Sequence, residues 1–129
     1  MAASYAKAKG RREKGSFVPL PRAVLQDEKF ARLSPRATKL LVDLLAQYGG
    51  FNNGDLEATF NTMQERGWRS KSQLAKGIKE LREAGFIRLT RQGGLGGCSL
   101  YAVTFFSIDE CGGKLEEPAT KTPPGDWRK

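Results

Sequence analysis

The sequence of 129 residues has no histidine and only two cysteines, Cys98 and Cys111. Histidine supplies many zinc and haem ligands and much of general acid–base catalysis, and two cysteines cannot form a disulfide framework. The chain also lacks any apolar run near the roughly 18 residues of a membrane span, and no signal-peptide core is found at its N-terminus. We therefore expect a cytoplasmic protein that is not an enzyme and needs no metal, cofactor, membrane or small-molecule substrate.

Positive charge is what the sequence has in excess. It contains 22 Lys and Arg residues against 14 Asp and Glu residues, which gives a formal charge of +8 at pH 7 and a sequence pI near 9.8. The hydrophobic fraction of 39% and the chain length suit one globular domain with its own core. A basic domain of this kind favours a polyanionic partner such as a nucleic acid.

The positive charge is concentrated in two parts of the chain. Residues 66–92 contain eight bases and two acids, a net charge of +6, and residues 1–16 contain five bases and one acid, a net charge of +4. Because neither end of the chain shows apolar periodicity, we expect a disordered basic arm at residues 1–16, a folded domain at residues 17–110 and a flexible C-terminal tail at residues 111–129. Trp127, in that tail, is interpreted as a stray aromatic residue, with docking on the domain or on a partner as the alternative.

Three helices are predicted in the first half of the domain. Residues 21–33, "PRAVLQDEKFARL", indicate one short helix. Ser34 and Pro35 then form an N-cap and a first-turn proline, and the helix that they start carries an apolar stripe over residues 37–48. Residues 56–67, "LEATFNTMQERG", predict a third and shorter helix.

A fourth helix is predicted at residues 70–84. Ser70 and Gln73 have the spacing of a capping box, and Gly85 stands where a C-terminal cap glycine belongs. The apolar residues fall on one side of this helix, which should face the core: Leu74, Ile78 and Leu81. The opposite side carries polar and mostly basic residues that suit phosphates and base edges: Arg69, Ser72, Gln73, Lys76 and Lys79.

The residues after this helix predict a β-hairpin. "FIRLTR" at residues 86–91 alternates apolar and polar side chains, "QGGLGG" at residues 92–97 forms a tip, and "SLYAVTFFSI" at residues 99–108 forms the returning strand. Two helices joined by a short turn and followed by a hairpin give the order of a winged helix-turn-helix domain. The expected fold is thus mostly α with a small antiparallel β-hairpin.

Four stretches extend this interpretation over most of the chain, from Phe17 to about Trp127. They are "FVPLPRAVL", "FARLSPRATKLLVDLL", "NNGDLEATFNTMQERGWRSKSQLAKGIKELREAGFI" and "TRQGGLGGCSLYAVTFFSIDECGGKL". The segment resembles winged helix-turn-helix DNA-binding proteins of bacterial mobile elements, which are carried by phages, plasmids and integrated islands. The resemblance implies a role as a transcription regulator or as a DNA-binding part of replication machinery.

Together these patterns predict a sequence-specific double-stranded DNA-binding protein that is associated with the nucleoid when bound. The helix at residues 70–84 would enter the major groove, and a basic wing would grip the same duplex. The predicted DNA contacts are Arg69, Ser70, Lys71, Ser72, Gln73, Lys76, Lys79, Arg88, Arg91 and Gln92. One such domain buries a modest area on DNA, so a homodimer on repeated half-sites is a further expectation.

Two other functions stay open. Winged helices also bind proteins, so the chain could be an adaptor that recruits or inhibits a host complex, with weak or no DNA contact. Structured RNA could use the same cations, although the deep and narrow major groove of A-form RNA does not admit a helix. The net charge of +6 in residues 66–92 favours nucleic acid over a protein partner, because most protein interfaces are depleted in Lys.

Overall fold

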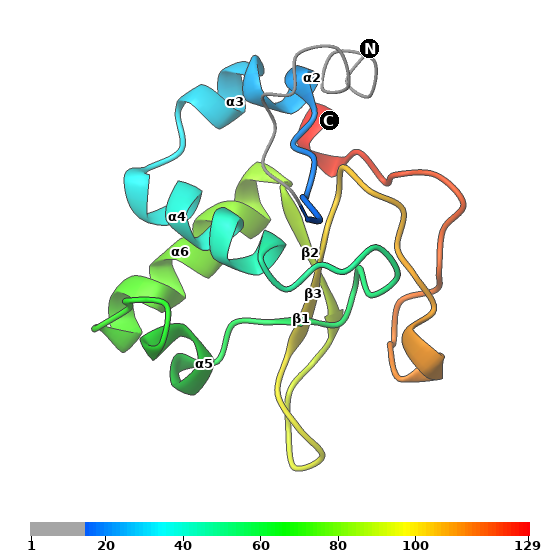
Figure 1. Cartoon of the computed structure of the whole chain (residues 1–129). Helices are drawn as coiled ribbons and strands as arrows, with labels where there is room; N and C mark the ends of the chain where they lie inside the picture. The colour runs from blue at the N-terminus through cyan, green and yellow to red at the C-terminus, as the bar shows by residue number, and fades with distance from the viewer. Residues whose placement is uncertain (1–14) are drawn as a thin grey trace.

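The computed structural model describes residues 15–129, so the predicted basic arm at residues 1–16 lies outside the described residues except for its last two. The chain forms helices packed against one face of a three-stranded antiparallel sheet, with the C-terminal segment running along the other side (Figure 1). The α-helices are α2 (Arg22–Leu25), α3 (Glu28–Ala31), α4 (Pro35–Leu45), α5 (Phe60–Gln64) and α6 (Lys71–Ala84). The strands and short 3-10 helices are β1 (Leu56–Glu57), β2 (Ile87–Arg91), β3 (Leu100–Val103), η1 (Cys111–Gly113) and η2 (Asp126–Arg128). No helix among residues 15–129 is long and apolar enough to cross a bilayer.

Helix α4 starts where the sequence predicts, at Ser34. The Ser34 Oγ accepts a hydrogen bond from the Ala37 N–H at 3.1 Å. The Glu80 carboxylate, on α6, accepts from the backbone N–H and the hydroxyl of Ser34 at 2.7 and 2.6 Å. Burial alone raises the pKa of Glu80, but these hydrogen bonds and the nearby Arg36 lower it below its ordinary value. A carboxylate at a helix N-terminus is stabilising, so this contact ties the start of α4 to α6.

Helices α4 and α6 approach closely because α6 has a glycine where they meet. Gly77 is buried, and a Cβ atom added to it would lie 3.3 Å from the Leu40 Cδ2 and 3.6 Å from the Trp68 Cη2. An alanine Cβ here would require the Leu40 side chain to shift by a few tenths of an ångström, and a larger side chain would have no room between the helices. The apolar stripe of α4 is buried in the common core: Ala37, Leu40, Leu41, Leu44 and Leu45.

Two of the predicted helices differ from the structure. Residues 21–33 form two helices instead of one, because the chain becomes extended at Asp27, whose carboxylate caps α3 by accepting from the Lys29 N–H at 2.8 Å. The helix predicted at residues 56–67 begins later, because its first residues form β1 and Thr59 caps α5. The fold is therefore a small domain of helices and a three-stranded antiparallel sheet, with one strand more than the predicted hairpin.

The sheet has the strand order β1-β3-β2, so the hairpin strand β3 lies in the centre. Leu56 of β1 is opposite Tyr101 of β3, and both pack in the core. Ile87 and Leu89 of β2 also contact the core cluster. Because successive side chains of a strand point to opposite faces, Arg88 lies on the face of the sheet away from α6.

A buried carboxylate on α4 holds the turn between α5 and α6. Asp43 is only 2% exposed, and its oxygens accept hydrogen bonds from the Trp68 Nε1–H at 2.7 Å, the Lys39 Nζ at 2.6 Å and the Arg66 Nε at 3.1 Å. Burial alone raises the pKa of Asp43, but the three hydrogen bonds outweigh it and lower the pKa below the ordinary carboxyl value. The turn therefore cannot move relative to α4 without breaking a charged cluster.

The C-terminal residues 111–129, predicted as a flexible tail, pack against the domain instead. Trp127 is 5% exposed, and its ring stacks on Phe86 with ring centroids 6.1 Å apart. Gly85 permits this approach, because a Cβ atom on it would lie 2.7 Å from backbone atoms of Asp126. The Pro and Gly content of the segment leaves room for only two short 3-10 helices but does not prevent docking, which is why composition alone pointed to a flexible tail.

We expect Asp43→Asn to lower the free energy of unfolding near neutral pH by about 2 kcal/mol, because the amide is uncharged and its NH2 group replaces one of the two oxygens that accept from Lys39, Arg66 and Trp68. The folded-state pKa of Asp43 is lowered, so its contribution is complete above about pH 5 and is lost as the pH falls through the unfolded value of about 3.9 toward the folded one. Urea unfolding at a series of pH values should show wild-type and variant stabilities converging in acid. A difference that stays constant with pH would contradict this account.

We expect Trp127→Ala to lower the free energy of unfolding by about 3 kcal/mol, because it leaves a cavity beside Phe86. Lys121→Ala is the matched control, since Lys121 lies in the same segment but is exposed. Its effect should stay within about 0.5 kcal/mol. Both are measured by chemical denaturation, and equal effects of the two substitutions would show that the segment does not contribute to the core.

Candidate nucleic-acid interface

Helix α6 presents one long exposed face. Both of its ends are capped, and its opposite side is buried against the core. The Ser70 Oγ accepts from the Gln73 N–H at 3.2 Å, which caps the start of the helix as predicted. At the other end Gly85 adopts a left-handed conformation with φ of 86°, as the predicted cap requires. The buried positions are Leu74, Gly77 and Leu81.

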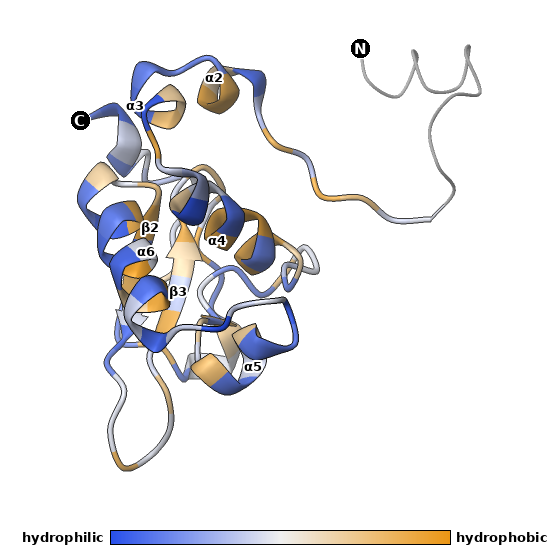
Figure 2. Cartoon of the chain, turned by 90° about the vertical axis from the view of Figure 1, so that its left-hand side faces the viewer, coloured by the Kyte–Doolittle hydropathy of each residue, from blue (hydrophilic) through white to orange (hydrophobic). Residues whose placement is uncertain are grey.

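The exposed side of α6 and of the turn before it carries six of the ten predicted contact residues. They are Arg69, Lys71, Ser72, Gln73, Lys76 and Lys79. We call these six residues the α6 ridge; Figure 2 views the molecule from the side on which α6 lies. The Lys71 Nζ lies 5.6 Å from the centroid of the Phe60 ring, a cation–π contact that holds it near the start of the helix. Ser70 is half-buried and used as a cap, so it is not part of the ridge.

Most cations on this side of the molecule are not neutralised. Among residues 15–129, no ion-pair partner is found for Arg69, Lys76, Lys79 or Arg82. Of the two acids of α6, Glu80 is turned toward Ser34 and Arg36 and does not offset them. The other, Glu83, is exposed near the end of the helix. The ridge therefore keeps a net positive charge.

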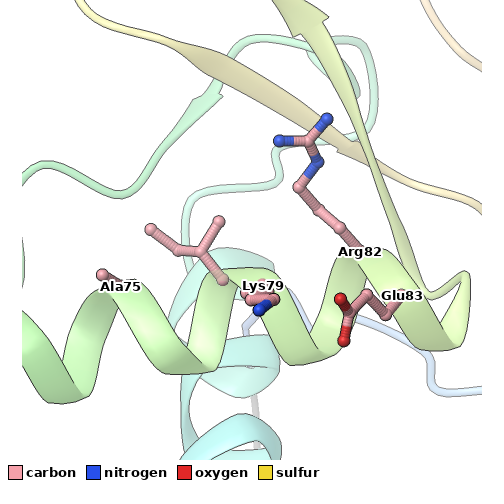
Figure 3. A pocket seen from close by; sticks show the side chains of 5 residues that line it. Ala75, Lys79, Arg82 and Glu83 are labelled. Carbon is pink, nitrogen blue, oxygen red and sulfur yellow. The ribbon is translucent and has the colours of Figure 1, made fainter.

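A trough with a volume of about 540 Å³ lies on one side of the ridge (Figure 3). Its lining residues are Ala75, Ile78, Lys79, Arg82 and Glu83. The Arg82 side chain extends from α6 toward the strands. It is close enough to Tyr101 to affect it: burial raises the pKa of Tyr101, and the positive charge of Arg82 partly offsets that rise. Arg82 was not among the predicted contacts, because its position on the helix lies nearer to the apolar side.

A second hollow lies on the other side of the ridge, between α4 and the start of α6. It has a volume of about 320 Å³. Its lining residues are Arg36, Lys39, Gly67, Trp68, Arg69, Ser70 and Gln73. We call this the α4–α6 hollow. Two of its cations, Arg36 and Lys39, belong to α4 and were not predicted to lie near the ridge.

Arg88, predicted as a DNA contact, is instead held on the far side of the sheet. Its guanidinium donates to Asp126 at 2.7 and 3.0 Å and to Glu117 at 3.1 Å. The hydrogen bonds and the charge of Arg88 lower the pKa of Asp126 despite partial burial. The prediction treated the hairpin in isolation and did not include the C-terminal acids that cover this face. Arg88 thus anchors the C-terminal segment.

Arg91 and Gln92 lie at the base of the β2–β3 hairpin, whose tip projects from the body of the molecule (Figure 1). The Arg91 Nη2 donates to the Cys98 carbonyl oxygen at 3.3 Å across the hairpin. The Gln92 N–H donates to the Glu116 carboxylate at 3.2 Å. Both residues share a hollow of about 280 Å³ with Glu116, so an acid stands beside the one basic side chain here. The hairpin is less positive than its sequence suggests.

The arrangement suits a polyanion. Lys and Arg neutralise phosphates, while Ser and Gln side chains can form hydrogen bonds with base edges. No group of three or more His, Cys, Asp or Glu side chains placed to hold a metal ion is found in the described part of the chain. Comparisons of the chain with protein-family models, with curated proteins and with solved structures find no match.

We expect Arg88→Met to lower the free energy of unfolding by about 1–2 kcal/mol, because Asp126 and Glu117 lose their charged donor. The loss should largely disappear in an Asp126→Asn background, as a double-mutant cycle measured by urea denaturation would show. If the two substitutions were simply additive, Arg88 would not anchor the segment through Asp126.

Proposed function

We propose that this protein binds double-stranded DNA, with α6 in the major groove and the β2–β3 hairpin as a wing beside it. In this proposal the domain is a winged helix-turn-helix, and α5 and α6 are its helix-turn-helix pair. One observation carries it: Arg69, Lys76 and Lys79 of the α6 ridge have no ion-pair partner in the described chain, while Glu80, one of the two acids of α6, is turned toward Ser34. An α-helix with its side chains is about 10–12 Å across, and the B-DNA major groove is about 12 Å wide.

The ridge residues divide between two tasks. Lys76 and Lys79 are exposed and neutralise phosphates, which releases condensed counterions. Ser72 and Gln73 read base edges, since they offer donors and acceptors near the start of the helix. The Gln73 carboxamide oxygen already accepts a hydrogen bond from Arg36, which holds the side chain in place. A side chain held in place before binding loses less conformational entropy on the DNA.

The wing plays the smaller electrostatic part in this proposal. Arg88 is committed to Asp126 and Glu117, so Arg91 is the remaining arginine of the hairpin strand β2. Glu116 beside Gln92 reduces the local positive charge further. Most of the salt-dependent affinity therefore comes from α6 and its flanks, and the wing mainly adds contact area.

A single α6 in one groove buries a modest area, so we propose that two copies act together on repeated half-sites. The biological role that we propose is regulation of transcription, or an accessory role in replication, for a bacterial mobile element. The resemblance in sequence supports this role, and the charge on α6 supports the choice of DNA as partner.

We expect Lys76→Ala and Lys79→Ala each to lower the slope of the logarithm of the binding constant against the logarithm of salt concentration by about one unit. The reason is that each substitution removes one phosphate contact. The measurement is a fluorescence-anisotropy titration of a random-sequence DNA duplex about two helical turns long at several salt concentrations. Lys121→Ala, an exposed lysine of the C-terminal segment, should keep the wild-type slope.

Two further results would redirect the proposal. Equal affinity for a duplex RNA of the same sequence would contradict insertion of α6 into a major groove, because the major groove of A-form RNA does not admit a helix. If neither duplex is bound in a salt-dependent way, the result favours the adaptor function, in which a protein partner contacts the domain. Wild-type slopes for both ridge variants, with DNA still bound, would place the duplex on another face.

A further inference from the structure

A helix in the major groove has a phosphate backbone on each side, because the groove lies between the two strands of the duplex. The two sides of α6 differ in this protein. On one side Lys79 and Arg82 border the trough beside the sheet. On the other side α4 crosses close by, and the α4–α6 hollow lies between the two helices. The second backbone would therefore meet the hollow and not open solvent.

The α4–α6 hollow is positively charged although acids lie close to it. Its surroundings hold four cations, Arg36, Lys39, Arg66 and Arg69, and two carboxylates, Asp43 and Glu80, which leaves a net charge of +2. Asp43 is 2% exposed and is already bonded to Lys39, Arg66 and Trp68. Both carboxylates are thus engaged by protein donors. The Lys39 Nζ also donates to the Arg66 carbonyl oxygen at 2.7 Å, so one of its three donors remains, and the side chains of Lys39 and Arg66 are 50% and 48% exposed.

Donors in the hollow also remain unused. The Arg36 guanidinium donates one hydrogen bond to Gln73, and its Nη2 is 4.0 Å from Glu80, while its Nε–H is buried and finds no acceptor in the described chain. Arg69 has no ion-pair partner among residues 15–129. A guanidinium has five donors and commonly binds phosphate with two of them. The hollow has the donors and the volume for one phosphate group.

We infer that the α4–α6 hollow is the binding site for a backbone phosphate of the DNA strand opposite the wing, held by Arg36, Lys39 and Arg69. The inference rests on the proposed function and adds to it the second strand and a helix, α4, outside the helix-turn-helix pair. The duplex is then held on both sides of α6. Because Arg36 also bonds Gln73, phosphate binding and base contact are joined at one side chain.

Lys39→Gln tests this inference, because Lys39 lines the hollow but is not part of the α6 ridge, is exposed, and is replaced by an amide that can still donate to Asp43. It should lower the salt slope for duplex DNA by about one unit. Arg22→Gln on α2, also exposed, is the matched control and should keep the wild-type slope. Urea denaturation of each variant checks that stability is unchanged.

The two tryptophans of the chain supply a second readout. Trp68 lines the hollow, whereas Trp127 lies in the C-terminal segment against Phe86. In a ¹⁵N-labelled full-length protein, adding the random-sequence duplex should shift the indole N–H signal of Trp68 and leave that of Trp127 in place.

The inference requires both the lower salt slope of the hollow variant and the shift of the Trp68 indole signal. The absence of either result overturns it. If Lys79→Ala lowers the slope while Lys39→Gln does not, the duplex lies on the α6 ridge but does not reach the hollow. If neither substitution changes the slope, the proposed function itself fails.

Discussion

The position of α6 depends on one buried carboxylate. Asp43 is on α4, yet it binds the indole of Trp68 and the guanidinium of Arg66 in the turn that leads into α6. A buried charge is costly unless fully satisfied, so the cluster allows one arrangement of the turn and penalises others. Gly77 and the contact of Glu80 with Ser34 then fix the rest of α6 on α4. The contacts that α6 and the turn before it make with α4 thus determine which face of α6 is exposed.

The local parts of the fold could be predicted from the sequence, and the distant contacts could not. The caps at Ser34, Ser70 and Gly85 depend on neighbouring residues, and each is found where the pattern placed it. Strand β1 has two residues and exists because β3 is beside it, so no pattern of its own could indicate it. Trp127 likewise finds its place on Phe86, which lies 41 positions earlier. In both cases a tertiary contact, and not the local sequence, determines the conformation and position of the segment.

The candidate site divides in the same way. Helical periodicity was sufficient to place Lys76 and Lys79 on an exposed face, because that depends only on residues within α6. It could not show that Arg36 and Lys39 lie beside Arg69 and Gln73, since Arg36 and Lys39 belong to α4. Nor could it show that Arg88 is neutralised by acids that follow it by 29 and 38 positions. Counting charges along residues 66–92 therefore overstated the positive charge of the β2–β3 hairpin and missed the cations of α4 that flank α6.

The docked C-terminal segment also has a dynamic consequence. It is joined to the domain by contacts that close long loops. They include backbone hydrogen bonds from Glu116 to Thr90 and from Gly125 to Thr104, and the hydrogen bond from the Lys29 Nζ to the Lys129 carbonyl oxygen at 2.6 Å. Segments of this kind open before the global unfolding of a domain, and native-state hydrogen exchange reports their opening. Each opening would release Arg88 from its acids while the Asp43 cluster kept α6 in place. The electrostatic field of the molecule would then fluctuate with the movement of its last residues.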